Sequence, residues 1–211
     1  MLERRTYLFD INAGTNDRGN IITGRPIVYN SKTDIGGMFE EVIDSGALDS
    51  TDLRDVRFLV NHNTDMIPLA RSRRNNGNST MQLTVDGDGM GINVVLDTEN
   101  NTDARALYSA VERGDLDGMS FMFSVDGEEW DNLNTDYPTR HITKIASVVE
   151  VSAVTFPAYE STEIYARNKE ALENAKETLD KAKRSTLENV ESAKDTELIL
   201  LKEQTKLLGG I

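Results

Sequence analysis

The chain changes composition near residue 160, and no other feature constrains its fold as strongly. All 4 prolines and 13 of the 15 glycines lie before that point, and no aromatic residue follows Tyr165. Proline and glycine interrupt helices and supply turns, whereas a segment without them can form a long helix. We therefore expect a turn-rich domain over residues 1–160 and a helical extension over residues 161–211.

The extension is rich in Ala, Leu, Glu and Lys and has no internal Gly or Pro, which is helix-forming composition. Leu172, Ala175, Leu179 and Ala182 are spaced by three and four residues, as in the contact seam of a coiled coil. The phase of this pattern slips at Leu187, which breaks a strict heptad repeat. Two interpretations stay open, namely a solvated helix or linker and a helix that docks on a partner.

Charge is also distributed unevenly along the chain. The net charge is −13, and residues 1–160 contribute −12 of it, with 26 acidic and 14 basic residues. Neutralising phosphates requires a surplus of Lys and Arg, so nucleic acid is not an expected partner. No apolar run reaches the roughly 18 residues of a membrane span, and the first residues lack the apolar stretch of a secretory signal. These features predict an intracellular protein without a membrane partner.

Few side chains are available for chemistry. The chain has no cysteine, which excludes thiol catalysis, disulfides and cysteine-based zinc sites. Its 2 histidines, His62 and His141, would need carboxylates to complete a metal site, so we expect neither a metal nor another cofactor. Any histidine-dependent catalysis therefore has two candidate residues.

A β-hairpin is the clearest local structure in the first 160 residues. Apolar and polar residues alternate in Met81–Val85 and again in Met90–Leu96. Between them lies Asp86-Gly87-Asp88-Gly89, whose glycines supply the positive φ that a tight turn requires.

Further strands and one short helix are expected downstream of the hairpin. Asp103 is suited to cap a short helix that ends at Gly114. Strands are predicted over Met119–Val125 and over Ile145–Phe156. Many strands and few helices indicate an α+β domain built on an antiparallel barrel or sandwich.

His62 follows the apolar strand Val56–Val60, within the polar triplet Asn61-His62-Asn63. A histidine where the chain leaves the core can be half exposed, as a general base must be. An ordinary strand-end histidine that bonds a neighbouring carbonyl fits the same pattern. His141 lies in a loop-like setting beside Pro138 and is the less suitable base.

Ser120 and Glu150 are the other candidates. Strand alternation from Gly118 puts Phe121 toward the core and Ser120 and Met122 on the opposite face. A serine hydroxyl needs an adjacent base to attack a carbonyl at neutral pH. Glu150 interrupts an apolar run in which an unpaired carboxylate is costly. It either orients an imidazole or points into water from an edge strand.

Taken in order, these segments resemble the prohead maturation proteases of tailed bacteriophages, serine peptidases distantly akin to the herpesvirus capsid-maturation protease, assemblin. The last segment, EVSAVTFPAY, is close to the family pattern EVSxVTxPAY. The matching segments are Ile22–Asn30, Phe39–Leu48, Val60–His62 with Pro68–Arg71, Gly118–Phe121 and Glu150–Tyr159. The resemblance covers about residues 5–160 and leaves the extension outside it.

The resemblance implies that Ser120 is the nucleophile, His62 the general base and Glu150 the acid that orients His62. It also implies an antiparallel β-barrel flanked by short helices. The region of Arg71 is the one candidate for the oxyanion hole.

The implied function is a serine endopeptidase that cleaves scaffold segments of capsid proteins, and itself, during prohead maturation. Its expected partners are the major capsid protein and its scaffold segment, with the portal and self-association left open. Its expected location is the procapsid in the host cytoplasm. Asn63, Ala70 and Met122 depart from the family pattern. They motivate the alternative of a catalytically degenerate internal scaffold protein that binds capsid subunits through its C-terminal helix.

Overall fold

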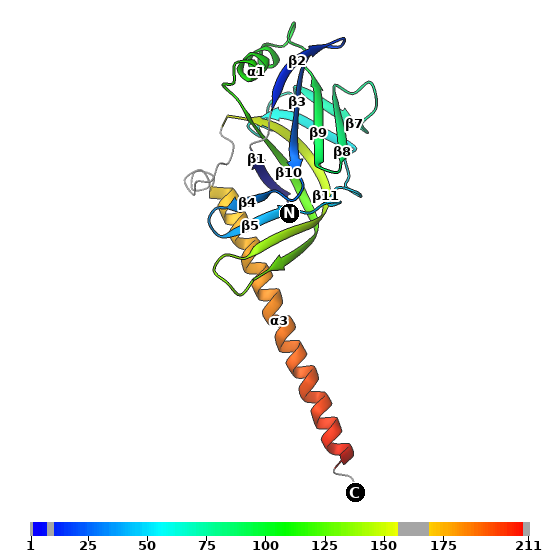
Figure 1. Cartoon of the computed structure of the whole chain (residues 1–211), viewed down its shortest axis with the longest axis vertical. Helices are drawn as coiled ribbons and strands as arrows, with labels where there is room; N and C mark the ends of the chain where they lie inside the picture. Colours follow the sequence, from blue (N-terminus) through cyan, green and yellow to red (C-terminus); the bar gives the residue numbers. More distant parts are fainter. Residues whose placement is uncertain (1, 8–10, 156–168, 209–211) are drawn as a thin grey trace.

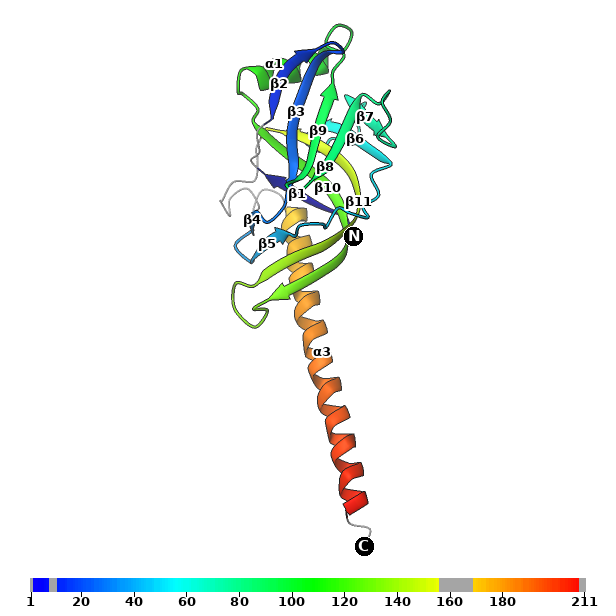
Figure 2. The same cartoon turned by 45° about the vertical axis from the view of Figure 1, so that its right-hand side comes forward.

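The computed structural model describes residues 2–7, 11–155 and 169–208. These residues form a β-rich body and one long helix, α3, that projects from it (Figure 1). The same arrangement is seen after a 45° rotation (Figure 2). The α+β class and the C-terminal helix expected from the sequence are thus confirmed, whereas the division at residue 160 stays a prediction.

The larger sheet of the body has seven strands. Its main path runs β1, β10, β11, β5, β4, and β6 joins it by pairing with β11 on one side and β7 on the other. The strands are β1 (Leu2–Tyr7), β4 (Lys32–Ile35), β5 (Phe39–Ile43), β6 (Asp55–Val60), β7 (Ala70–Arg73), β10 (Gly118–Asp131) and β11 (Thr139–Val154). The strands predicted around residues 119 and 145 are therefore present and longer than expected.

The smaller sheet has four strands in the order β2, β3, β9, β8. They are β2 (Asn12–Asn16), β3 (Gly19–Val28), β8 (Met81–Asp86) and β9 (Gly89–Val95). The pairing of Asp86 with Gly89 closes the β8–β9 hairpin, as predicted, but of the two turn glycines only Gly89 has positive φ. Gly89 has φ +134°, and a Cβ there would lie 2.1 Å from the carbonyl oxygen of Ile27. Only glycine fits this close approach between β9 and β3.

The predicted barrel is wrong, because the sheets are open. A barrel requires its first and last strands to pair, but β1 and β4 occupy opposite ends of the main path. The larger sheet instead forks at the long strand β11. The first part of β11 pairs in parallel with β5 through residues 139–142, and its last part pairs in parallel with β6 through residues 150–153. One strand thus serves two branches.

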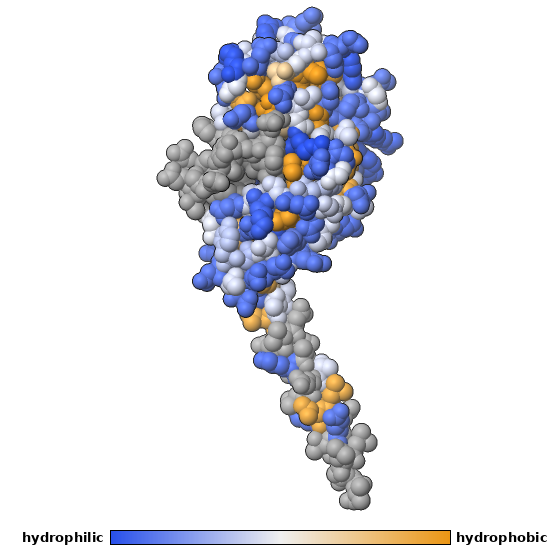
Figure 3. Space-filling view, in the orientation of Figure 1, coloured by the Kyte–Doolittle hydropathy of each residue, from blue (hydrophilic) through white to orange (hydrophobic). Residues whose placement is uncertain are grey.

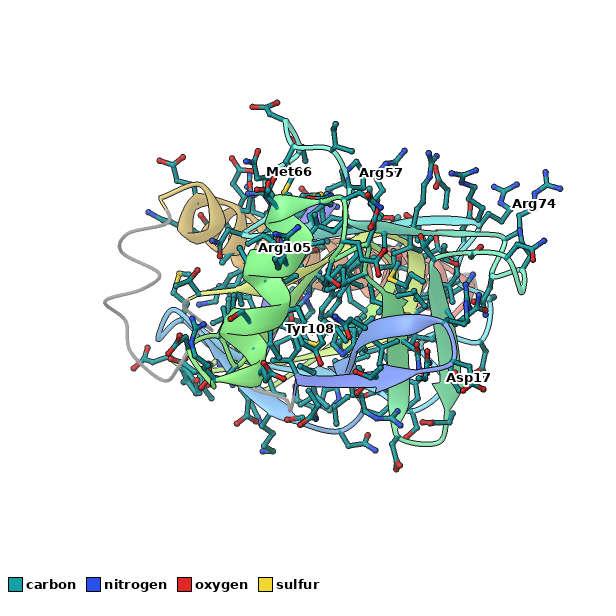
Figure 4. All side chains as sticks on the ribbon, turned by 90° about the horizontal axis from the view of Figure 1, so that it is seen from above. Asp17, Arg57, Met66, Arg74, Arg105 and Tyr108 are labelled. Atoms are coloured by element: carbon teal, nitrogen blue, oxygen red, sulfur yellow. The ribbon has the colours of Figure 1, made fainter. Side chains whose placement is uncertain are left out.

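Helix α1 (Thr102–Glu112) lies across the end of the β body, as a view from above shows (Figure 4). Its N-cap is Asn101, whose side chain accepts hydrogen bonds from the backbone N–H groups of Asp103 and Ala104. The predicted cap at Asp103 is therefore two residues late, while Gly114 follows the helix end as expected. Within the described residues α1 is the one short helix, where several were expected.

The main hydrophobic core joins α1 and the two sheets. It contains buried side chains such as Ile22 of β3, Met81 of β8, Phe58 of β6 and Phe121 of β10. Phe58 and Phe121 come from the same strands that carry or precede the candidate site residues. Because side chains alternate along a strand, packing these phenylalanines into the core places Ser120 on the opposite face of the sheet.

Helix α3 (Lys169–Leu208) contacts the body near its start. Ala175 and Leu179 of the predicted seam pack against Ile35 and Phe39 of β4 and β5. These two seam residues therefore contact this chain's own body. Further along, apolar side chains are exposed, and the stretch Ile199–Leu201 is more than half exposed (Figure 3). Within the described part of the chain, no helix is long and apolar enough to cross a membrane.

Candidate active site

The turn after β6 presents the imidazole of His62. Asn61 and His62 have φ of 51° and 57°, a left-handed conformation that is uncommon for residues other than glycine. The backbone N–H of Asn61 donates to the carbonyl of Ala153 at 2.9 Å, and its side-chain oxygen accepts from the N–H of Thr155 at 2.9 Å. The end of β11 therefore holds this turn in place.

Ser120 and Glu150 are positioned by the pairing of β10 with β11. Ser120 lies opposite Ser152, and Met122 lies opposite Glu150. Directly paired residues point to the same face of a sheet, so Ser120 and Glu150 share a face. Because β6 pairs with the other edge of β11, the turn that follows β6 reaches this face.

The three candidate side chains form a continuous hydrogen-bonded chain. Nδ1 of His62 lies 2.5 Å from Oε1 of Glu150, and Nε2 lies 2.6 Å from Oγ of Ser120. An ionised carboxylate can only accept, so it favours the tautomer in which Nδ1 carries the proton and Nε2 can accept from the serine. Glu150 is 2% exposed, so it does not point into water. His62 likewise bonds two side chains rather than a carbonyl.

Ser152 is a further member of the site that sequence reasoning missed. Its hydroxyl donates to Oε2 of Glu150 at 2.6 Å and accepts from the backbone N–H of His62 at 3.0 Å. It is fully buried. The sequence did offer one indication of this role. Ser152 follows Glu150 by two residues, which places both side chains on one face of a strand.

Ser120 also contacts the N-terminal strand. Its hydroxyl donates to the carbonyl oxygen of Arg5 at 2.7 Å, and the residue has no exposed surface. A serine hydroxyl has one proton, so the Arg5 carbonyl and Nε2 of His62 compete for it. In this closed arrangement the hydroxyl is shielded from solvent.

His141 is far from these residues and is not in a loop. It lies within β11 opposite Glu129, nine positions before Glu150. At about 3.3 Å per residue this corresponds to roughly 30 Å along the strand. Its Nδ1 lies 2.9 Å from Oδ1 of Asp44. The loop-like setting expected for His141 is therefore wrong, and its low rank as a base agrees with its position.

The positions that depart from the family pattern have local roles. The side chain of Asn63 accepts a hydrogen bond from the N–H of Asp65 at 3.1 Å, and Ala70 is buried at the start of β7. Met122 is 7% exposed on the strand of Ser120.

Arg71 donates two hydrogen bonds to Asp55, at 2.5 and 2.7 Å. These bonds, together with the nearby Arg57 charge, overcome desolvation and lower the pKa of Asp55. Arg71 lies on β7, three strands from β10. The guanidinium of Arg71 thus binds Asp55 and does not lie beside Ser120, where an oxyanion hole would be needed.

The arrangement has the parts that acyl transfer needs, namely a hydroxyl, an imidazole aimed at it and a carboxylate that fixes the imidazole. Among the residues that the structure describes, no group of three or more His, Asp or Glu is arranged to hold a metal ion.

Comparisons with known proteins identify one family. The family model described as caudovirus prohead serine protease matches residues 8–178. No curated protein matches the chain. Among solved structures, the bacteriophage T4 capsid assembly protease gp21 is similar at 14% identity with a TM-score of 0.41, and the match covers 74% of this chain and 98% of that one.

Proposed function

Because the chain belongs to the caudovirus prohead serine protease family, we propose that it is an endopeptidase with a Ser120–His62–Glu150 triad. The observation that carries this proposal is the pair of short contacts that His62 makes, 2.5 Å to Glu150 and 2.6 Å to Ser120. The sequence separations of these pairs are 88 and 58 residues, so their meeting is a product of the fold.

In the first step, Oγ of Ser120 forms a bond to the scissile carbonyl carbon while Nε2 of His62 takes its proton. The imidazolium then gives that proton to the leaving amine as the C–N bond breaks, which leaves an acyl-enzyme ester on Ser120. In the second step, His62 takes a proton from water, whose oxygen attacks the ester carbon. Return of the proton to Ser120 releases the new carboxyl terminus.

Glu150 has two roles in this mechanism. It fixes the tautomer in which Nε2 accepts, and its negative charge stabilises the imidazolium that forms in each step. Ser152 holds the second carboxylate oxygen at 2.6 Å and therefore acts as a positioning residue.

The substrates proposed are scaffold segments of capsid proteins, including the major capsid protein, and the enzyme itself. The portal is a further candidate partner. The reaction would take place in the procapsid within the host cytoplasm. Family membership supports a role in capsid maturation, and these individual substrates are our proposal.

The test is co-expression with the cognate major capsid protein, followed by mass measurement of both proteins. We expect processing with the wild-type chain and none with Ser120→Ala. Ser124→Ala is the matched control, because Ser124 lies on the same strand but bonds Ser147 at 2.8 Å. Unchanged processing by Ser120→Ala would show that the assignment is wrong.

A second candidate function is an inactive internal scaffold that binds capsid subunits through α3. The exposed apolar residues Leu187 and Ile199–Leu201 favour this candidate. It predicts that Ser120→Ala still gives normal procapsids, whereas removal of residues 161–211 prevents their assembly. The mass measurement separates the two functions, because an inactive scaffold leaves the capsid protein unprocessed even with the wild-type chain.

A further inference from the structure

The N-terminal strand β1 covers the edge of the strand that carries Ser120. β1 pairs antiparallel with β10 over six residues, from Leu2 opposite Ser124 to Tyr7 opposite Met119. Thr6 lies directly opposite Ser120. β1 is at the end of the sheet, and both cartoon views place it beside β10 (Figures 1 and 2).

An extended peptide commonly binds by adding a strand to a sheet edge. Along the edge of β10, that place is filled by β1. The backbone carbonyl of Arg5 accepts a hydrogen bond from Ser120, and Ser120 has no exposed surface. A peptide that binds along this edge of β10 has to replace β1.

Two charged side chains, Glu3 and Arg5, fasten β1 to the body. Arg5 donates from both Nε and Nη2 to the carboxylate of Glu41 on β5, the Nη2 bond being 2.6 Å long. Arg140 on β11 donates to the two carboxylate oxygens of Glu3 at 2.7 and 2.9 Å. All four residues are buried.

None of the described side chains of β1 belongs to a hydrophobic core cluster, and Leu2 is 49% exposed. The family match begins at residue 8, directly after β1. A strand held by backbone pairing and ion pairs can be exchanged for another strand without opening an apolar core.

The side chains of Glu41 and Arg140, which bind β1, would stay paired if β1 left. Nη1 of Arg140 donates to Oε2 of Glu41 at 2.9 Å, and Arg140 also donates to Glu128. Glu41 and Arg140 therefore form a preformed pair of opposite charge beneath the edge. Because alternate residues of a strand point to the same side, this pair suits an acidic and a basic residue two positions apart.

We propose that the β10 edge is the substrate-binding edge of the enzyme, and that β1 occupies it as an internal stand-in for substrate. This inference rests on the proposed protease function. Glu41 recognises a basic side chain of the bound peptide, and Arg140 recognises an acidic side chain two residues before it. The enzyme is closed until β1 leaves.

A reversible lock in the full-length chain tests the position of the site. The double variant Leu2→Cys/Ser124→Cys joins residues that lie directly opposite each other, at a separation that a disulfide can span. The natural chain has no cysteine, so no other thiol interferes. We expect a fluorophosphonate probe to label the reduced form at least 10-fold faster than the oxidised form. The single variants should be indifferent to oxidation.

Charge variants test recognition. Glu3→Gln/Arg5→Gln should release β1 and raise the labelling rate at least 10-fold, whereas Arg4→Gln on the same strand should change it less than twofold. In the released variant, the free peptide Leu-Glu-Arg-Arg-Thr-Tyr at about 1 mM should slow labelling at least fivefold. The same peptide with Gln at its second and fourth positions should not.

The outcomes separate this inference from the proposed function. Equal labelling of the oxidised and reduced forms, or equal effects of the two peptides, overturns the inference but does not contradict the proposed protease function. Failure of every form to react at Ser120 overturns the proposed function, and the inference falls with it.

Discussion

The hydroxyl of Ser152 donates a 2.6 Å hydrogen bond to Oε2 of Glu150. The other carboxylate oxygen of Glu150 faces Nδ1 of His62 at 2.5 Å. Since Ser152 also accepts from the backbone N–H of His62, it ties the acid and the base to each other. The orientation of the imidazole therefore depends on a residue that does not touch the reacting atoms.

Ser152→Ala should lower kcat by roughly 10- to 150-fold with little change in KM. The variant removes one hydrogen bond to a charged group, worth about 1.5–3 kcal/mol, while the substrate contacts stay. Steady-state kinetics on a capsid-derived peptide measures the split, and Ser152→Thr should restore most of kcat because it keeps the hydroxyl. A loss confined to KM, or no rescue by threonine, contradicts the positioning role.

Glu150→Gln should lower kcat by about 10⁴-fold, the magnitude found when a triad acid becomes an amide. An amide cannot stabilise the imidazolium and can donate to Nδ1, which favours the wrong tautomer. Burst kinetics with an activated ester measures the acylation rate. The exposed Glu129 on β10 provides the control, and Glu129→Gln should be as active as wild type. Equal activity of the two variants contradicts the role of Glu150.

Glu3 should make the attachment of β1 sensitive to acid. Burial raises the pKa of its carboxyl, but the Arg5 charge and the hydrogen bond from Arg140 outweigh burial and lower it from 4.5 to about 2. A carboxyl with a depressed folded-state pKa stabilises the fold above its unfolded pKa, and this contribution is lost as the pH falls toward 2.

The measurement is the difference in Tm between wild type and Glu3→Gln. It should be constant from pH 7 to about pH 5 and shrink steadily between about pH 4.5 and pH 2. A difference that does not change over this range contradicts the pairing of Glu3 with Arg5 and Arg140.

Gly89→Ala should destabilise the fold by roughly 3 kcal/mol, because φ is +134° and the added Cβ would lie 2.1 Å from the carbonyl oxygen of Ile27. Gly87→Ala in the same turn is the control, since a Cβ added there would have no neighbouring atom within 4 Å. Urea unfolding compares the two variants. Equal stability contradicts the close approach of β9 to β3.

Structural features that depend on a few neighbouring residues could be predicted from the sequence. The β8–β9 hairpin follows from alternating apolar residues on both sides of a turn with two glycines, and the strand carrying Ser120 follows from the same period of two. The residue types needed for acyl transfer were also visible, because so few histidines compete for the role of base. Each of these depends on neighbours within a few residues.

Features that depend on distant pairing were not predictable. The fork at β11 requires two parallel partners, β5 and β6, which no local pattern specifies. Ser152 has the sequence appearance of any small polar residue in a strand. The contact between Ser120 and the Arg5 carbonyl uses a backbone atom, and every residue carries one. Only the fold brings these groups together.

The most direct test of the central claim is the site and rate of fluorophosphonate labelling, read by mass spectrometry of the digested protein. The account predicts one adduct, on Ser120, that disappears in Ser120→Ala and forms at least 100-fold more slowly in His62→Ala, while Ser124→Ala labels as wild type does. An adduct on another residue, or labelling of Ser120 at an unchanged rate without His62, would contradict it.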